Sequence, residues 1–281
     1  MTAKIESIVK KTIKDWKLLS NNDRILVAAS GGKDSTAVLS ILSNLFDDVQ
    51  AITIDAAIGN YSNECLLNVK SFCNDHAIKL HVVSFREQFG YSLCYLQSVL
   101  RSKGLGLNSC AICGVLKRYL LNRKSREIKA SVLVTGHNMD DEAQSIVMNL
   151  LRANLLLLSR LGPRTGAITN PAFVPRVKPL YFVQEKLVES YSRSMLFPVK
   201  YSRCPCSAES YRNSVRNLLS AYEQKHPGTT RAIIDYFLGI LPQLRRSLDN
   251  NDSVNCCESC GEPAKGSVCK ACQLIAALRK G

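Results

Sequence analysis

The chain has 281 residues, of which 46% are hydrophobic, and its 37 basic and 23 acidic side chains give a formal net charge of +14. This length is sufficient for one α/β domain of about 200 residues with a small appendage. The longest apolar runs, such as the four leucines at 155–158, are far shorter than the roughly 20 residues that cross a bilayer, which excludes a membrane span.

The N-terminal residues 1–23 predict an amphipathic helix, because apolar residues recur at helical spacing between lysines. They lack the continuous hydrophobic region and the cleavage site of a signal peptide, so we expect a cytoplasmic protein. Residues 24–29 then predict a short buried strand, and residues 36–46 predict a helix.

The loop between this strand and this helix, SGGKDS, predicts a phosphate-binding site. A helix N-terminus offers unpaired N–H groups, and glycines let the backbone approach an anion closely. A lysine adds a full charge, and serine hydroxyls can donate to phosphate oxygens. The alternative is an ordinary turn capped by Asp34 or Ser35. The spacing GxxxxGK followed by Ser or Thr is absent, which disfavours kinases and motor ATPases. The expected phosphate contacts are Ser30, Gly31, Gly32, Lys33, Asp34 and Ser35.

Further apolar runs predict strands with helical stretches between them. This alternation predicts an α/β fold with a doubly wound parallel sheet. Beyond about residue 165 prolines punctuate the chain, so the sheet is expected to be complete there. Helices are expected at 184–196, 207–225 and 228–248, with Pro242 kinking or interrupting the last one. The predicted strands are 24–29, 49–55, 79–85 and 131–136.

Parallel sheets bind ligands at the carboxyl ends of their strands, and two further polar groups lie at such ends. The first is Asp55 and the second is TGHNMDDE at 135–142. We therefore expect Asp55, Gly136 and His137 to contact the same ligand as the loop. An ordinary structural histidine would fit the pattern equally well, and the acidic residues 140–142 could simply favour a helix start.

Seven of the twelve cysteines lie at spacings typical of metal ligands. Four of them form two CxxC pairs in the tail, which predicts a tetrahedral structural zinc site, with a redox or disulfide role as the alternative. The spacing favours Cys257 over Cys256 as the first ligand. The predicted ligands are Cys257, Cys260, Cys269 and Cys272.

A third CxxC pair, Cys110 and Cys113, precedes a helix expected at 115–127, and Cys204-Pro-Cys206 follows much later. These two groups could form a joint metal site, a thiol redox pair or structural contacts. Three cysteines on a four-iron cluster would leave one iron open for a reactant. The remaining cysteines at 65, 73 and 94 stand among apolar residues and are expected in the core.

The composition suggests four parts, and a polar linker at 249–253 connects the last of them, the cysteine-rich tail, to the rest of the chain. They are an amphipathic helix at 1–23, an α/β catalytic domain at 24–200, a helical extension at 201–250 and a separate zinc ribbon at 251–281. The positive charge is concentrated: six of the thirteen residues at 117–129 are basic, and residues 143–184 hold five basic side chains and no acid. Such a surface favours RNA recognised by shape, or else is solvated without a partner.

Four stretches together, SGGKDS, CAICGVLKR, TGHNMDDEA and CPCSAESYRNSVRNLL, resemble the tRNA thiolases of the TtcA/TtuA superfamily of PP-loop ATP pyrophosphatases. The zinc tail resembles the TtuA-like branch. The resemblance implies that ATP adenylates a uridine C2 carbonyl of tRNA and that sulfur then replaces the oxygen, giving 2-thiouridine. It also implies a [4Fe-4S] cluster held by Cys110, Cys113 and Cys204, with sulfur on the open iron.

The resemblance further implies roles for individual residues. Lys117 matches an active-site lysine, although a solvated helix lysine would also fit. Asp141, or else Asp140, matches the catalytic aspartate, and Asp34 and Asp141 could orient Mg²⁺. Relatives often have an aromatic residue where Cys206 stands, so Cys206 is an alternative third cluster ligand.

Partners are implied in the same way. The sulfur would come from sulfide or from a ubiquitin-like carrier ending in a thiocarboxylate, and a homodimer is expected. The stretch 222–237 resembles enzymes that modify the T-loop uridine more than those acting on the anticodon wobble uridine. Residues 1–23 contain no cysteine, so the N-terminal zinc finger of the family is expected to be missing. The alternatives are a PP-loop ligase such as a lysidine synthase and a non-catalytic zinc-containing RNA-binding protein.

Overall fold

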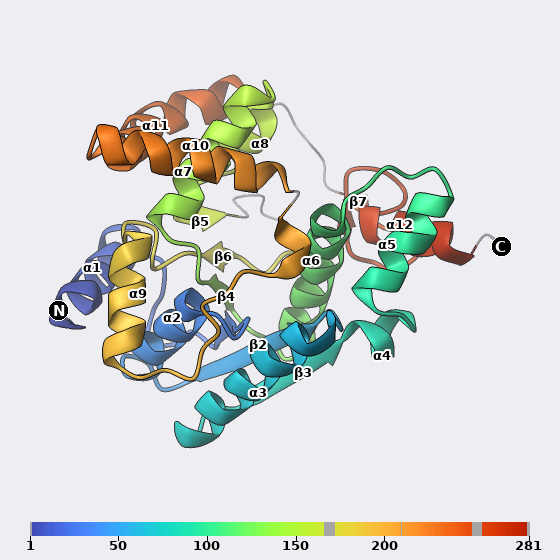
Figure 1. Ribbon diagram of the computed structural model, residues 1–281, viewed down its shortest axis with the longest axis horizontal. Helices are drawn as coiled ribbons and strands as arrows, with labels where there is room; N and C mark the ends of the chain where they lie inside the picture. Colours follow the sequence, from blue (N-terminus) through green and yellow to red (C-terminus); the bar gives the residue numbers. More distant parts are fainter. Residues whose placement is uncertain (1, 166–171, 209, 249–254, 280–281) are drawn as a thin grey trace.

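A computed structural model describes residues 2–165, 172–208, 210–248 and 255–279. Its centre is a six-stranded sheet in the order β3-β2-β1-β4-β6-β5 (Figure 1). All neighbouring strands are parallel except the edge pair β5 and β6. The strands are β1 (Ile25–Ala28), β2 (Val49–Asp55), β3 (Leu80–Ser84), β4 (Val132–Thr135), β5 (Arg164–Thr165) and β6 (Arg176–Val177).

The parallel sheet and its four predicted strands are confirmed, but the expectation that the sheet ends by residue 165 is wrong. Strand β6 pairs with β4 in parallel, and Leu133 N donates to Pro175 O at 2.8 Å. A strand of two residues beside prolines has no periodicity to detect, which is why the sequence conceals it.

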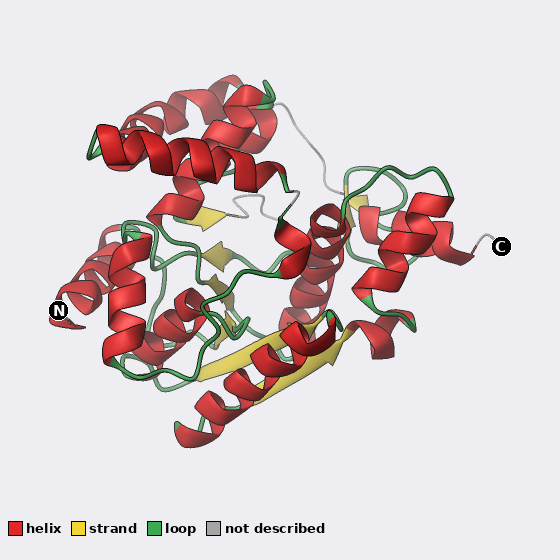
Figure 2. Cartoon of the chain, viewed as in Figure 1, coloured by secondary structure: helices red, strands yellow, loops and turns green. Residues whose placement is uncertain are grey.

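Helices cover both faces of the sheet, as Figure 2 shows. Alternate residues of the central strands enter different cores, so Val27 shares one core with Val38 whereas Leu26 shares another with Leu116. The helices are α1 (Thr2–Asp15), α2 (Lys33–Ser43), α3 (Gly59–Asp75), α4 (Phe85–Phe89), α5 (Leu93–Ser102), α6 (Ser109–Glu127), α7 (Met139–Leu151), α8 (Leu155–Ser159), α9 (Glu185–Ser194), the short 3₁₀ helix η1 (Pro205–Ser207), α10 (Tyr211–Lys225), α11 (Thr229–Ser247) and α12 (Lys270–Arg279).

Helices α7, α8, α10 and α11 form a lobe at the top of the view in Figure 1. A third apolar cluster, which includes Met139, Ile234 and Phe237, holds the lobe together. Pro242 lies inside α11, and the helix continues past it to Ser247. The proline therefore does not interrupt the helix. None of the helices in the described ranges is long and apolar enough to cross a membrane.

The cysteine-rich tail packs against the α/β domain. Its helix α12 packs against α5 and α6 (Figure 1). Its hairpin of β7 (Asn255–Cys256) and β8 (Pro263–Ala264) adds Ala264 to the same apolar core. Leu274 shares one apolar core with Leu116 and Leu120. The polar linker expected at 249–253 lies outside the described residues. The tail therefore gains apolar burial from the α/β domain, besides any contribution from a metal.

Candidate functional site

The SGGKDS loop joins β1 to α2 in a conformation that requires its first glycine. Gly31 has φ +79°, and a Cβ there would lie 2.5 Å from the carbonyl oxygen of Cys65. Ser30 N donates to Ser35 Oγ at 3.0 Å, which closes the loop. The helix begins at Lys33, earlier than the predicted Thr36, because the extended Gly32 serves as its N-cap. Lys200 pairs with the loop from the other side, donating its N–H to Gly31 O at 3.2 Å.

The side chain of Lys33 is held between two carboxylates. Its Nζ lies 2.9 Å from Asp34 Oδ2 and 2.9 Å from Glu185 Oε1. Burial favours the neutral amine, but the two acids outweigh it and raise the pKa of Lys33 above its usual value. Burial raises the pKa of Asp34, with the charge of Asp141 adding to the rise and Lys33 opposing it. Burial alone would raise the pKa of Glu185, but the hydrogen bond and charge of Lys33 outweigh it and hold this pKa below its usual value.

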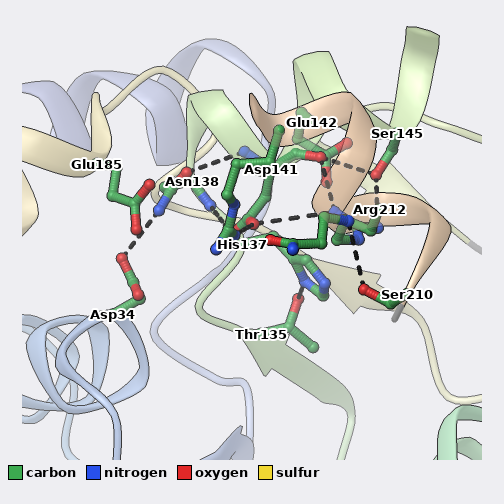
Figure 3. Close-up of polar contacts among 12 residues, drawn as sticks. Asp34, Thr135, His137, Asn138, Asp141, Glu142, Ser145, Glu185, Ser210 and Arg212 are labelled. Atoms are coloured by element: carbon green, nitrogen blue, oxygen red, sulfur yellow. Dashed lines mark hydrogen bonds and ion pairs between the residues drawn. The ribbon is translucent and has the colours of Figure 1, made fainter. Parts of the chain in front are cut away.

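The carboxyl end of β4 brings a second polar group to this loop (Figure 3). A Cβ on Gly136 would lie 2.8 Å from Ser35 N, so a glycine lets β4 abut α2. Asn138 links the two, donating from Nδ2 to Asp34 Oδ1 at 2.9 Å. His137 Nδ1 lies 2.9 Å from Thr135 Oγ1.

The two neighbouring aspartates have different surroundings. Asp141 forms a capping box with Asn138, as the helix-start alternative predicts, and its Oδ1 also lies 3.4 Å from Arg216 Nη2. Asp140 instead accepts from Glu185 N at 2.7 Å and so fixes the start of α9. Of the two, Asp141 lines the cavity beside the loop.

Two adjoining cavities meet at this edge of the sheet. The larger, of about 470 Å³, is lined by loop residues together with Gly136, His137 and Asp141. The smaller, of about 290 Å³, is lined by five cysteines: Cys65, Cys110, Cys113, Cys204 and Cys206. Ser30, Ile54 and Lys117 line both cavities. Lys117 therefore lies between a phosphate-binding loop and a group of thiols.

Helix α6 positions two of the thiols. It begins at Ser109 with an Asn108 cap, earlier than predicted, so that Cys110 and Cys113 lie one turn apart. Cys110 Sγ donates to Cys206 O at 3.3 Å. Burial raises the pKa of Cys110 and Cys113, with Cys204 adding to the rise and Lys117 opposing it. Burial and the Cys204 thiol raise the pKa of Cys206 to about 11.

The thiols around this cavity could hold an iron–sulfur cluster. Among the described residues, the metal-ligand set found at close spacing is in the tail, not here. Iron–sulfur clusters are held by cysteine thiolates, and Cys110, Cys113 and Cys204 line one cavity. Cys206 lines the same cavity, so either Cys204 or Cys206 could be the third ligand of a cluster.

The tail cysteines fit zinc. The four predicted sulfurs, of Cys257, Cys260, Cys269 and Cys272, lie within 4.8 Å of one another. The separation between Cys260 Sγ and Cys269 Sγ is 3.7 Å. Tetrahedral ligands at ~2.3 Å from zinc would stand about 3.8 Å apart. Cys256, the alternative first ligand, is exposed, whereas Cys257 is buried.

Some predicted residues lie elsewhere than expected, and sequence reasoning missed others. Asp55 lines the cysteine cavity rather than the loop cavity. Cys94 is exposed and not in the core, whereas Cys65 and Cys73 are buried. The missed residues are Glu185, Arg212, Arg216, and the buried ion pair of Lys178 with Glu142 at 2.8 Å. Arg212 and Arg216 lie one turn apart in the motif CPCSAESYRNSVRNLL, and this spacing was the available signal that both could reach one site.

The fold and the loop define a PP-loop nucleotide-binding protein. The PP-loop domain family model matches residues 1–221. The chain is 32% identical over 284 residues to the cytoplasmic tRNA 2-thiolation protein 1 of Caenorhabditis elegans, covering 98% of this chain and 73% of that protein. It is 33% identical over 267 residues to the tRNA-5-methyluridine(54) 2-sulfurtransferase of Thermus thermophilus, covering 94% and 80%.

Among solved structures, the U34-tRNA thiolase NcsA from Methanococcus maripaludis, with its [4Fe-4S] cluster, matches with a TM-score of 0.79 at 28% identity. The match covers 97% of this chain and 86% of that one. The chain therefore belongs to the PP-loop family of tRNA 2-thiolation sulfurtransferases. The resemblance drawn from the four motifs is confirmed at this level.

Proposed function

We propose that this protein is an ATP-dependent tRNA 2-thiouridine synthetase. The observation that carries the proposal is the placement of Lys117, which lines both the PP-loop cavity and the cysteine cavity. A nucleotide in one cavity and a sulfur source in the other would both reach a uridine placed beside this lysine. The family membership supports the same reaction.

The reaction has two steps. The uridine O2 attacks the α phosphate of ATP, and pyrophosphate leaves. Sulfur then attacks C2, and AMP leaves with the original oxygen. The uracil carbonyl oxygen is a poor leaving group until it is bonded to phosphate, which explains the need for ATP.

The chain's own residues would assist the first step. The loop N–H groups and Lys33 bind the departing pyrophosphate, and Asp34 and Asp141 line the same cavity as ligands for Mg²⁺. Lys117 would stabilise the charge that develops between the two cavities. When bound, a [4Fe-4S] cluster on Cys110, Cys113 and Cys204 would supply an open iron for the incoming sulfur.

The further assignments are part of the same proposal. The tRNA binds to the basic surface that includes 117–129, and the C-terminal ribbon holds Zn²⁺. Sulfide or a ubiquitin-like thiocarboxylate carrier donates sulfur to a cytoplasmic enzyme that forms a homodimer. The T-loop uridine is the proposed target because of the stretch 222–237. The parts 1–23, 24–200, 201–250 and 251–281 are kept as the proposed division.

The test is an oxygen-free reaction of iron-loaded protein with unmodified tRNA, ATP, Mg²⁺ and sulfide. The products are mapped by mass spectrometry of nucleosides and tRNA fragments. We expect 2-thiouridine in the T-loop. If 2-thiouridine instead appears at the anticodon wobble position, the proposed reaction stands and the proposed target is wrong. AMP formation that depends on added lysine, without sulfur in the RNA, would establish a ligase instead. Binding of tRNA without ATP cleavage would establish a non-catalytic RNA-binding protein.

A further inference from the structure

Glu185 occupies an unusual place for an acid in an ATP site. Its carboxylate contacts Lys33, the lysine of the phosphate-binding loop, at 2.9 Å. The exposed fraction of the Lys33 side chain is 12%, so the contact is largely shielded from water. An anion bound at this loop would need the same ammonium group, and a carboxylate beside it would repel phosphate.

The two carboxylates around Lys33 differ in their freedom to move. Asp34 is held through its second oxygen by Asn138 Nδ2 at 2.9 Å. Glu185 is the first residue of α9, and its backbone N–H is bound to Asp140. Its side chain is 34% exposed, and its carboxylate forms an ion pair with Lys33. The carboxylate of Glu185 can therefore swing into solvent while its backbone stays fixed.

We propose that Glu185 is an internal counter-ion that competes with phosphate for Lys33 and must be displaced when nucleotide binds. It holds the lysine in the loop in the unliganded protein and weakens the binding of small anions there. A triphosphate chain, which contacts the loop N–H groups as well, displaces it. Glu185 thus acts as a positioning residue that selects against inorganic phosphate. This inference rests on the ATP site of the proposed function but not on thiolation.

The test is calorimetric binding of pyrophosphate, phosphate and ATP to the full-length protein without tRNA, with Mg²⁺ and with a chelator. Glu185→Gln preserves the size of the side chain and the backbone contact with Asp140. We expect this variant to bind pyrophosphate about tenfold more tightly than the wild type in the presence of the chelator, as loss of one charged competitor implies. Phosphate, which we expect the wild type to bind too weakly to detect, should then bind measurably.

Glu189→Gln is the matched control, because Glu189 lies on the same helix and pairs with Arg193 away from the loop. Its affinities should equal those of the wild type. The double variant Lys33→Met with Glu185→Gln should lose the gain, which ties the effect to the lysine. Glu185→Ser offers a second way to remove the charge and should bind pyrophosphate as tightly as the glutamine variant.

Three outcomes would overturn the inference. Equal affinity of the wild type and Glu185→Gln would show that the contact does not compete with phosphate. If Glu185→Gln bound ATP more weakly than the wild type in the presence of Mg²⁺ but not with the chelator, Glu185 would be a ligand of the metal. Failure of the wild type to bind ATP at all would remove the proposed function as well, whereas the first two outcomes leave it intact.

Discussion

The residue whose position says most about mechanism is Lys117, on the turn of α6 that follows Cys113. For Lys117→Gln we expect thiolated tRNA to fall at least about 10²-fold, as the loss of a charge that stabilises a transition state predicts. Iron content and ATP binding should stay at wild-type levels, since the proposed ligands of both are other residues. Product formation in single-turnover reactions and iron analysis provide the measurements.

Lys124→Gln is the control for this substitution. Lys124 lies two turns later on α6 and pairs with Glu127 at 2.8 Å. It should retain full thiolation. If both lysine variants lost activity equally, the effect would belong to the general charge of the helix and not to the position between the two cavities.

Gly31 allows the PP-loop to pass close to α3. Gly31→Ala places a methyl group 2.5 Å from the carbonyl oxygen of Cys65 and also forces a non-glycine residue to φ +79°. Gly90→Ala imposes a similar φ of +81° with no other atom within 4 Å. We expect the Gly90 variant to lose about 1 kcal/mol of unfolding free energy and the Gly31 variant about 1–3 kcal/mol more. Urea unfolding measures both, and equal losses would contradict the close approach.

The sequence predicted this loop because its parts are contiguous. Glycines, lysine and serines within six residues act through the backbone of one turn, so their spacing alone indicates an anion site. Glu185 joins the same site from 152 residues away and through tertiary packing. Nothing in its local sequence, the first turn of an amphipathic helix, distinguishes it from a solvated acid.

At the scale of elements, the cysteine-rich ribbon at the C-terminal end of the described residues is attached to the helix that bears Cys110 and Cys113. Glu262 is 5% exposed; it accepts from Asn122 Nδ2 at 2.6 Å and lies 3.1 Å from Arg126. Asn122 also accepts from Val174 N at 3.1 Å. One buried carboxylate of the ribbon thus contacts α6 directly, and one buried amide joins it to the loop before β6.

Removal of this carboxylate should weaken the attachment of the ribbon. For Glu262→Ala we expect a loss of about 1–3 kcal/mol, because Asn122 keeps a buried N–H group without its partner. Zinc should be lost to a chelator faster than from the wild type. Glu127→Ala, which removes an exposed pair on the same helix, should cost less than about 1 kcal/mol. Zinc retention and urea unfolding compare the two variants. Equal losses of unfolding free energy would argue against the buried contact.

The elements that sequence reasoning missed share a physical cause. Four strands long enough to show an apolar run were predicted, whereas β6 has two residues and is recognisable only from its partner β4. The cysteines of the ribbon predicted a metal site but not the contact with α6. That contact joins residues such as Leu274 and Leu116, and the spacing of apolar residues within one helix does not identify the helix against which it packs.

The net charge of the whole molecule, +14, bears on how tRNA would be held. Each phosphate contact releases counterions, so a footprint of about six to ten phosphates loses roughly 10³–10⁵ in affinity between 50 and 200 mM salt. We expect tRNA binding to fall by that order over this range. A slope near zero, measured by filter binding, would contradict a basic docking surface.

Lys200 connects the two halves of the site along the backbone. Its N–H bonds to Gly31 O at 3.2 Å, and four residues later the chain reaches Cys204. We therefore expect an adjustment of the PP-loop around a triphosphate to reach a thiol of the cysteine cavity over this short stretch. A reduced cluster held there should report nucleotide occupancy through its electron paramagnetic resonance spectrum, with g values that shift when ATP is added and return when it is removed.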